Sequence, residues 1–282
     1  MIRPNLEGRS LLVDGLAGKS AFTVDFYAAT GGGGDSKPLL LVVPGGGYSH
    51  VAEREGLPVA GHFAALGLHT AVLTYSVGEV RFPAALAELA ATIQYFQTRG
   101  QALGVDPERV YVLGFSAGGH LALSYAVYWS RAGFWPKLLK QPGLKPIQGL
   151  LLCYPVVTAG EFAHQGSIRN LVGDGEAGFT REDVSLEKQI ARCPDFPPLF
   201  LWHTWDDRSV PVENSLLLLQ ELRRKFPENA VEAHLFETGP HGLGLATTES
   251  DPGDGSRISS RVALWTTAAD AWLRERITAK YV

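Results

Sequence analysis

The stretch Val110-Tyr-Val-Leu-Gly-Phe-Ser-Ala-Gly-Gly119 decides the fold. Its apolar run, typical of a buried strand, ends in Ser116, which has Gly114 two residues before it and Gly118 two residues after it. A serine that turns sharply out of a strand into a helix has its hydroxyl raised above the sheet edge, and this backbone leaves room for little more than hydrogen at those two positions. The helix expected over 118–128 directs its N-terminal amides at the same point. Ser116 is therefore the candidate nucleophile.

Continuous apolar runs alternate with helical patterns along the rest of the chain. We expect buried strands at 38–43, 70–75, 109–115, 147–154, 198–203 and 231–236, and a half-buried antiparallel strand at 22–27. Helical spacing occurs at 55–66, 83–103, 212–226 and 257–277. Strands that alternate with helices pair in parallel through right-handed crossovers. The sequence therefore predicts an α/β fold with a mostly parallel central sheet flanked by helices on both faces.

The length of the chain is consistent with one domain. The 282 residues, of which 45% are hydrophobic, suffice for a single packed unit over 1–282. Two stretches interrupt the alternation: 128–145, which is rich in aromatic residues and lysines, and 158–197, which has scattered Gly, Asn and Asp. Such folds carry their substrate-facing loops after strands, so we expect both insertions to face substrate.

Composition excludes several classes of partner. The chain has 25 basic and 29 acidic residues, a net charge of −4, and no basic face for nucleic acid or for an anionic membrane. The apolar run over 111–129 contains Ser116, glycines and His120, so it is expected to be a core segment and not a membrane span. The first residues lack the pattern of a signal peptide, which predicts a cytoplasmic protein. Cys153 and Cys193 have no C-x-x-C spacing for zinc or redox chemistry.

A serine nucleophile needs a histidine to take its proton and a carboxylate to orient that histidine. In a doubly wound fold of this kind, the acid is expected after a later strand and the histidine after the last one. Asp206 and Asp207 follow the strand at 198–203, and the spacing Asp-x-x-Val-Pro favours Asp207. Asp206 is then a solvated turn residue or a helix-capping acid. His241 lies in a glycine-rich loop after the last strand and is the candidate base.

The other histidines are interpreted as structural. His203 and His234 lie at or within strands and are expected to be packed or hydrogen-bonded core groups, and His120 is expected to pack at the sheet edge. The sequence shows no cluster of polar residues around three further histidines, which are His62, His69 and His164. No pair of histidines has metal-ligand spacing with a nearby acid, so we expect neither a metal nor an organic cofactor.

A glycine-rich turn, Pro44-Gly-Gly-Gly-Tyr48, follows the strand at 38–43. No Gly-Lys-Ser/Thr follows it, and it lacks the glycine spacing of a dinucleotide site, so a phosphate loop is excluded. Acyl transfer instead needs backbone amides that stabilise an oxyanion. We predict that Gly46 and Gly47, together with Ala117, supply these donors and that Gly45 shapes the turn.

Over residues 39–245 the chain resembles the α/β-hydrolase superfamily, and within it the carboxylesterases and acetyl-xylan-esterase-like proteins of bacteria. The stretches that carry the resemblance are Val43-Pro-Gly-Gly-Gly-Tyr48, Glu53-Arg-Glu55, Gly-Phe-Ser-Ala-Gly-Gly-His120, Tyr154-Pro155 and Pro197-Pro-Leu-Phe-Leu-Trp-His-Thr204. The resemblance implies Ser116 as nucleophile, Asp207 as orienting acid and His241 as base.

One departure from that resemblance concerns the acid turn. Similar proteins often have a small residue before the paired aspartates, whereas this chain has Trp205. Our hypothesis is that Trp205 packs over the acid loop or narrows the acyl pocket, which would favour acetyl over longer acyl groups. Trp205 and Tyr48 are the candidate substrate-binding residues.

The expected activity is hydrolysis of short-chain carboxylic esters, acetyl esters foremost, on small molecules or sugars through an acyl-serine intermediate. A serine peptidase of the prolyl-oligopeptidase type shares this catalytic order but usually has a further large domain, for which 282 residues leave no space. A ligand-binding protein on the same scaffold is the third hypothesis, and the complete set of Ser, Asp and His argues against it. The expected partner is a small ester, and the sequence leaves a homo-oligomer open.

Overall fold

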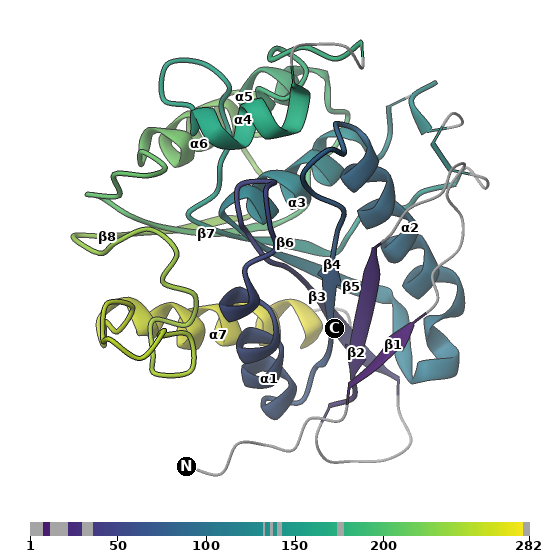
Figure 1. Ribbon diagram of the computed structural model, residues 1–282. Helices are drawn as coiled ribbons and strands as arrows, with labels where there is room; N and C mark the ends of the chain where they lie inside the picture. Colours follow the sequence, from purple (N-terminus) through teal and green to yellow (C-terminus); the bar gives the residue numbers. More distant parts are fainter. Residues whose placement is uncertain are drawn as a thin grey trace.

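The computed structural model describes residues 8–11, 22–29, 36–131, 133–135, 138–139, 143–173 and 178–278. Within these residues, the strands form one sheet of eight in the order β1-β2-β4-β3-β5-β6-β7-β8 (Figure 1). Their bounds are β1 Gly8–Leu11, β2 Thr23–Tyr27, β3 Lys37–Val43, β4 His69–Thr74, β5 Val105–Phe115, β6 Gly149–Cys153, β7 Leu199–Thr204 and β8 Val231–Phe236. The strands from β4 to β8 in that order are parallel, and β1 and β2 pair antiparallel at one edge.

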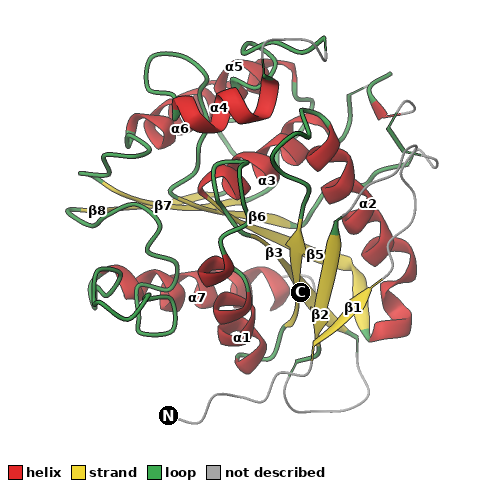
Figure 2. Ribbon diagram, viewed as in Figure 1, coloured by secondary structure: helices red, strands yellow, loops and turns green. Residues whose placement is uncertain are grey.

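Helices cover both faces of the sheet, as the alternation of elements predicts (Figure 2). Their bounds are α1 Leu57–Ala65, α2 Ala84–Arg99, α3 Ser116–Tyr128, α4 Gln165–Val172, α5 Leu186–Gln189, α6 Glu213–Lys225 and α7 Trp265–Thr278. α1 and α7 pack against one face, and α2, α3 and α6 against the other. Because strands such as β3 and β6 contribute side chains to both cores, they are apolar at nearly every position, which is the property that predicted a sheet buried on both faces.

The structure differs from the sequence-based expectation in three places. β1 was not expected, because the stretch is short and lacks apolar alternation; Arg9 and Ser10 in it are exposed. The last helix begins at Trp265, not at residue 257, because the amide of Ser259 bonds to the carbonyl oxygen of Ala246 over 2.9 Å and holds the preceding segment in a turn. The insertion over 158–197 contains α4 and α5.

The insertion at 128–145 is described only in part. Residues 132, 136–137 and 140–142 of that insertion lie outside the described residues. Among the helices that the structure describes, none has the length and apolar character needed to cross a bilayer.

Candidate active site

Ser116 lies at the sharp turn between β5 and α3, with a left-handed φ of 52°. The two flanking glycines are required by close packing around this turn. A β-carbon on Gly118 would lie 2.1 Å from the carbonyl oxygen of Val43, and one on Gly114 would lie 2.5 Å from the carbonyl oxygen of Gly118. No side chain fits at either position. Gly118 is required because α3 packs against the end of β3, and Gly114 is required because the start of α3 packs back on β5.

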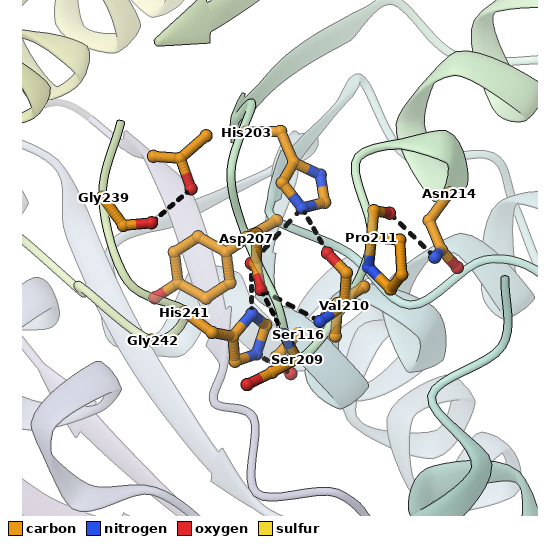
Figure 3. A network of polar contacts seen from close by, with 12 residues as sticks. Ser116, His203, Asp207, Ser209, Val210, Pro211, Asn214, Gly239, His241 and Gly242 are labelled. Carbon is orange, nitrogen blue, oxygen red and sulfur yellow. Dashed lines mark hydrogen bonds and ion pairs between the residues drawn. The ribbon is translucent and has the colours of Figure 1, made fainter. Parts of the chain in front are cut away.

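His241 and Asp207 complete a line of hydrogen bonds that begins at Ser116 (Figure 3). Nε2 of His241 lies 2.7 Å from Oγ of Ser116, and its Nδ1 lies 2.6 Å from Oδ2 of Asp207. The carboxylate accepts a hydrogen bond from Nδ1, so the proton of the neutral ring resides there. Nε2 is thereby left to accept the hydroxyl hydrogen of Ser116. The structure thus brings together the three residues that the sequence placed after β5, β7 and β8.

Asp207 is buried and held in an ionised state by its hydrogen bonds. Its Oδ1 accepts the amides of Ser209 at 2.9 Å and Val210 at 3.0 Å, and Nε2 of His203 lies 3.4 Å from its Oδ2. Burial raises the pKa of this carboxyl, but the hydrogen bonds from His203, His241 and Val210 outweigh burial and set the pKa well below its ordinary value. The carboxylate is therefore charged throughout the neutral and mildly acidic range.

The loop that carries His241 is fixed to the acid turn by Asp206. One carboxylate oxygen of Asp206 accepts the hydroxyl of Thr238 at 2.7 Å, and the other accepts the amide of Gly239 at 2.8 Å. The hydroxyl of Thr204 also donates to the carbonyl oxygen of Gly239 at 2.8 Å. Asp206 is an exposed residue of a turn, as one of the two expectations had it, and its side chain in addition joins two loops of the candidate site.

The turn over residues 45–47 lies directly beside Ser116. A β-carbon on Gly45 would lie 2.9 Å from Cβ of Ser116, and the amide of Gly45 donates to Oε2 of Glu55 at 2.8 Å. Among the described residues, none accepts a hydrogen bond from the amide of Gly46 or Gly47. Ala117 lies in the first turn of α3, where amides have no acceptor within the helix. The turn and the helix start together offer donors next to the Ser116 hydroxyl.

Glu55 and Tyr154 form a buried bridge that sequence reasoning left without a role. Glu55 is 1% exposed, and its Oε1 accepts the hydroxyl of Tyr154 at 2.9 Å. The same hydroxyl oxygen accepts the amide of Gly244 at 2.8 Å, and the Tyr154 ring packs on His241 with centroids 4.9 Å apart. The one sequence signal for both residues was that they belong to stretches that carry the resemblance.

The two candidate substrate-binding residues differ strongly in burial. Tyr48 is 3% exposed, and its hydroxyl donates to Nδ1 of His120 at 2.8 Å, so this hydroxyl already has a buried partner. Trp205 is 60% exposed, and its amide donates to the carbonyl oxygen of Phe236 at 2.8 Å at the edge of the sheet. Its ring lies largely in solvent and not packed over the acid loop.

His120, His69 and His164 have polar partners that the sequence did not indicate. Nε2 of His120 lies 2.8 Å from the carbonyl oxygen of Val184, and burial lowers the pKa of His120 to about 4. Nδ1 of His69 accepts the amide of Ala29 at 3.0 Å. Nδ1 of His164 accepts the amide of Ser167 at 3.2 Å. The expectation that His69 and His164 have no polar surroundings is therefore wrong, because their partners are distant in sequence or on the following helix turn.

Among the described residues, no group of three or more His, Cys, Asp or Glu side chains is arranged to hold a metal ion. What the described residues at the site offer is a hydroxyl bonded to an imidazole, a carboxylate behind that imidazole, and amides beside the hydroxyl. Such a set can activate a serine for attack on a carbonyl carbon and can stabilise the oxyanion that results.

Comparisons with known proteins agree with this geometry. The profile of the α/β hydrolase fold family matches residues 45–192, which include the glycine turn and Ser116. The chain is 32% identical over 213 residues to Endo-1,4-beta-xylanase B from Butyrivibrio fibrisolvens. That match covers 73% of this chain and 32% of the relative, so the chain spans about a third of the length of that protein.

Two solved structures match over nearly the whole chain. The acetyl ester-xyloside bifunctional hydrolase from Caldicellulosiruptor lactoaceticus is 33% identical with a TM-score of 0.75, and the match covers 89% of this chain and 88% of that one. A carboxylesterase from Lactobacillus plantarum WCFS1 is 29% identical with a TM-score of 0.81, over 96% and 98% of the two chains. The chain therefore belongs to the α/β hydrolase fold family and is similar to esterases within it.

Proposed function

We propose that this protein is a serine carboxylic ester hydrolase that acts on short-chain esters, acetyl esters foremost, of small molecules or sugars. The observation that carries the proposal is the continuous line from Ser116 through His241 to Asp207, with hydrogen bonds of 2.7 and 2.6 Å, beside a turn with free amides. In this proposal Ser116 is the nucleophile, His241 the general base and acid, and Asp207 the residue that orients His241.

Acylation begins when Oγ of Ser116 attacks the ester carbonyl carbon and its proton passes to Nε2 of His241. The carbonyl oxygen becomes an oxyanion, which accepts hydrogen bonds from the amides of Gly46, Gly47 and Ala117. Asp207 stabilises the imidazolium because its carboxylate is ionised and bonded to Nδ1. When the tetrahedral intermediate collapses, the bond to the alcohol oxygen breaks and Nε2 returns the proton to that oxygen.

Deacylation repeats these steps with water as the nucleophile. His241 takes a proton from a water molecule, whose oxygen attacks the acyl carbon of the acyl-serine. The second tetrahedral intermediate collapses, the bond to Oγ of Ser116 breaks, and Nε2 gives the proton back to Oγ. The products are a carboxylic acid and an alcohol, and the serine is free for the next cycle.

The comparisons support a small acyl group and a sugar as the alcohol part of the substrate. One similar structure is named an acetyl ester-xyloside bifunctional hydrolase and another a carboxylesterase, and a curated relative of which this chain covers 41% is named an acetylxylan esterase. The first curated relative is named a xylanase, but this chain covers only 32% of its length, so its name adds little about the activity of this chain.

Labelling with a fluorophosphonate followed by peptide mapping tests the nucleophile. We expect the label on Ser116 alone, and we expect Ser116→Ala to lose on the order of a millionfold in turnover of p-nitrophenyl acetate. A panel of p-nitrophenyl esters of increasing acyl length and of acetylated xylo-oligosaccharides then tests the substrate. A label on another serine, or near wild-type hydrolysis by Ser116→Ala, would refute the mechanism.

A further inference from the structure

His164 stands at the start of α4, in the insertion over 158–197, and borders the glycine turn of the candidate active site. A β-carbon on Gly47 would lie 3.9 Å from Cε1 of His164 and 3.6 Å from Oγ of Ser167. The side-chain amide of Asn170 on the same helix donates to the carbonyl oxygen of Gly47 at 2.9 Å. The first turns of α4 are therefore held against the turn that supplies the oxyanion donors.

The hydrogen bonds of His164 determine which ring nitrogen carries the proton. Its Nδ1 accepts the amide of Ser167 at 3.2 Å and lies 2.8 Å from the Ser167 hydroxyl. Nδ1 acts as the N-cap acceptor of α4, so the neutral ring has its hydrogen on Nε2. Within the part of the chain that the structure describes, Nε2 has no hydrogen-bond partner.

The electrostatics of His164 point to a neutral donor close to the reacting groups. Burial lowers its pKa below the ordinary histidine value, His241 lowers this pKa further, and Asp207 opposes both effects. The ring is therefore uncharged at neutral pH.

The position of His164 decides which half of the ester it meets. The alcohol oxygen must come within reach of Nε2 of His241, because that atom protonates the leaving group. His164 lies against Gly47, in the turn that borders Ser116, and Nε2 of His241 is bonded to Ser116 at 2.7 Å. We therefore take His164 to adjoin the space through which the alcohol part leaves. A half-buried N–H without a partner is stabilised there by an oxygen acceptor, and an alcohol with several hydroxyl groups supplies one.

We propose that Nε2–H of His164 donates a hydrogen bond to a hydroxyl oxygen of the substrate alcohol and so favours esters of polyhydroxy alcohols, such as sugars, over esters of simple alcohols. This inference rests on the proposed function, and it assigns His164 to substrate binding and not to the chemical steps. It predicts that the contribution of His164 is seen in KM and only with alcohols that have an acceptor.

His164→Asn separates binding from helix capping. Asparagine is a good N-cap residue, so the bond to the Ser167 amide is retained while the distal N–H is lost. Kinetics are measured with a monoacetylated methyl xyloside and with phenyl acetate, which share the acyl group. We expect kcat/KM for the xyloside ester to fall by about tenfold, mainly through KM, and the value for phenyl acetate to stay within about twofold.

His62→Asn is the matched control, because His62 lies on α1 at the other face of the sheet. His62→Asn should leave kcat/KM unchanged for both esters. His164→Ala also removes the cap, so it should lower the thermal midpoint of unfolding. It should raise KM for the xyloside ester by the same factor as His164→Asn. An equal fall for both substrates, or no fall for either in a folded His164→Asn, would overturn the inference.

The wild-type enzyme separates failure of this inference from failure of the proposed function. Wild-type protein that hydrolyses phenyl acetate but shows no preference for the xyloside ester refutes the role of His164 and leaves the esterase intact. Wild-type protein that hydrolyses neither ester refutes the proposed function itself, and the inference with it.

Discussion

Tyr154 donates its hydroxyl hydrogen to Oε1 of Glu55 across 2.9 Å, and this bond joins the two halves of the candidate active site. On one side, Glu55 holds the amide of Gly45 and with it the glycine turn. On the other side, the Tyr154 hydroxyl holds the amide of Gly244 in the loop that carries His241. The glycine turn and the loop that carries His241 are therefore joined through one buried side-chain pair.

Tyr154→Phe tests this bridge. The substitution leaves the amide of Gly244 without its acceptor and leaves Oε1 of Glu55 with only the Arg54 guanidinium, 3.7 Å away, which costs about 1–3 kcal/mol of unfolding free energy. We expect turnover of p-nitrophenyl acetate to fall by at least about tenfold, because a small misplacement of the base or the donors slows the reaction. Urea unfolding and steady-state kinetics measure the two effects.

Tyr125→Phe is the control for this experiment. The hydroxyl of Tyr125 donates to the carbonyl oxygen of Lys145 at 2.8 Å, in the core around α3 and away from the site loops. Tyr125→Phe should lower the free energy of unfolding by a similar amount and leave turnover of p-nitrophenyl acetate unchanged. Equal activity of the two variants would show that the Tyr154 hydroxyl does not position the site.

Two adjacent aspartates are expected to differ strongly in their importance. Asp207→Asn removes the charge that orients His241 and stabilises its protonated form, so we expect kcat to fall by about ten-thousandfold. Asp206→Asn keeps one acceptor, for the amide of Gly239, its NH2 group can donate to the Thr238 hydroxyl, and it touches neither His241 nor Ser116, so the loss should stay below about tenfold. Steady-state assays with p-nitrophenyl acetate at neutral pH measure kcat of both variants. Comparable losses would contradict the assignment of the acid.

The glycine turn has a matched pair of its own. A β-carbon on Gly46 would lie 2.0 Å from the carbonyl oxygen of His50, and its φ is +123°. Gly46→Ala should therefore displace the turn and lower kcat by about a hundredfold or more. Gly67, with φ +96° and nothing within 4 Å of such a β-carbon, provides the control. Gly67→Ala should lower stability and leave kcat unchanged. If kcat fell in Gly67→Ala and not in Gly46→Ala, the turn would have no part in the reaction.

The local part of the site could be predicted from the sequence, because its determinants are neighbours along the chain. The glycines around Ser116 follow from the turn that they occupy. Asp207 and His241 are 34 residues apart, yet they could be placed together because loops after parallel strands meet at the same edge of a sheet. Family resemblance implied the same three residues in the same roles.

The supporting contacts could not be predicted, because they join segments that no local pattern connects. Glu55 and Tyr154 are 99 residues apart, and each alone is an ordinary residue after a turn or a strand. His164 lies in an insertion without strong periodicity, so nothing in the sequence placed it beside Gly47. Trp205 has a position in the sequence that suggested packing near the acid, but its side chain faces solvent.

His120 gives the last prediction, which concerns stability and pH. Burial lowers the pKa of His120 to about 4, and the hydrogen bond to Val184 opposes this shift only in part. In the unfolded chain a histidine titrates near about 6.5. Between these two values the unfolded chain binds a proton that the folded protein does not. The unfolding free energy must therefore fall as the pH is lowered from about 6.5 to about 4, and this contribution is constant below that range.

His120→Gln isolates this contribution, because glutamine can occupy the site but does not titrate. The shift of about 2.5 pKa units corresponds to about 3 kcal/mol, so the stability advantage of the wild-type protein over His120→Gln should shrink by about that amount between pH 7 and pH 4. Urea unfolding of both proteins across this range measures it. Depression of the Asp207 pKa acts at lower pH and in both proteins alike, so it cancels in the difference. Parallel stability curves for the two proteins would show that His120 is protonated in the folded state as readily as in the unfolded one.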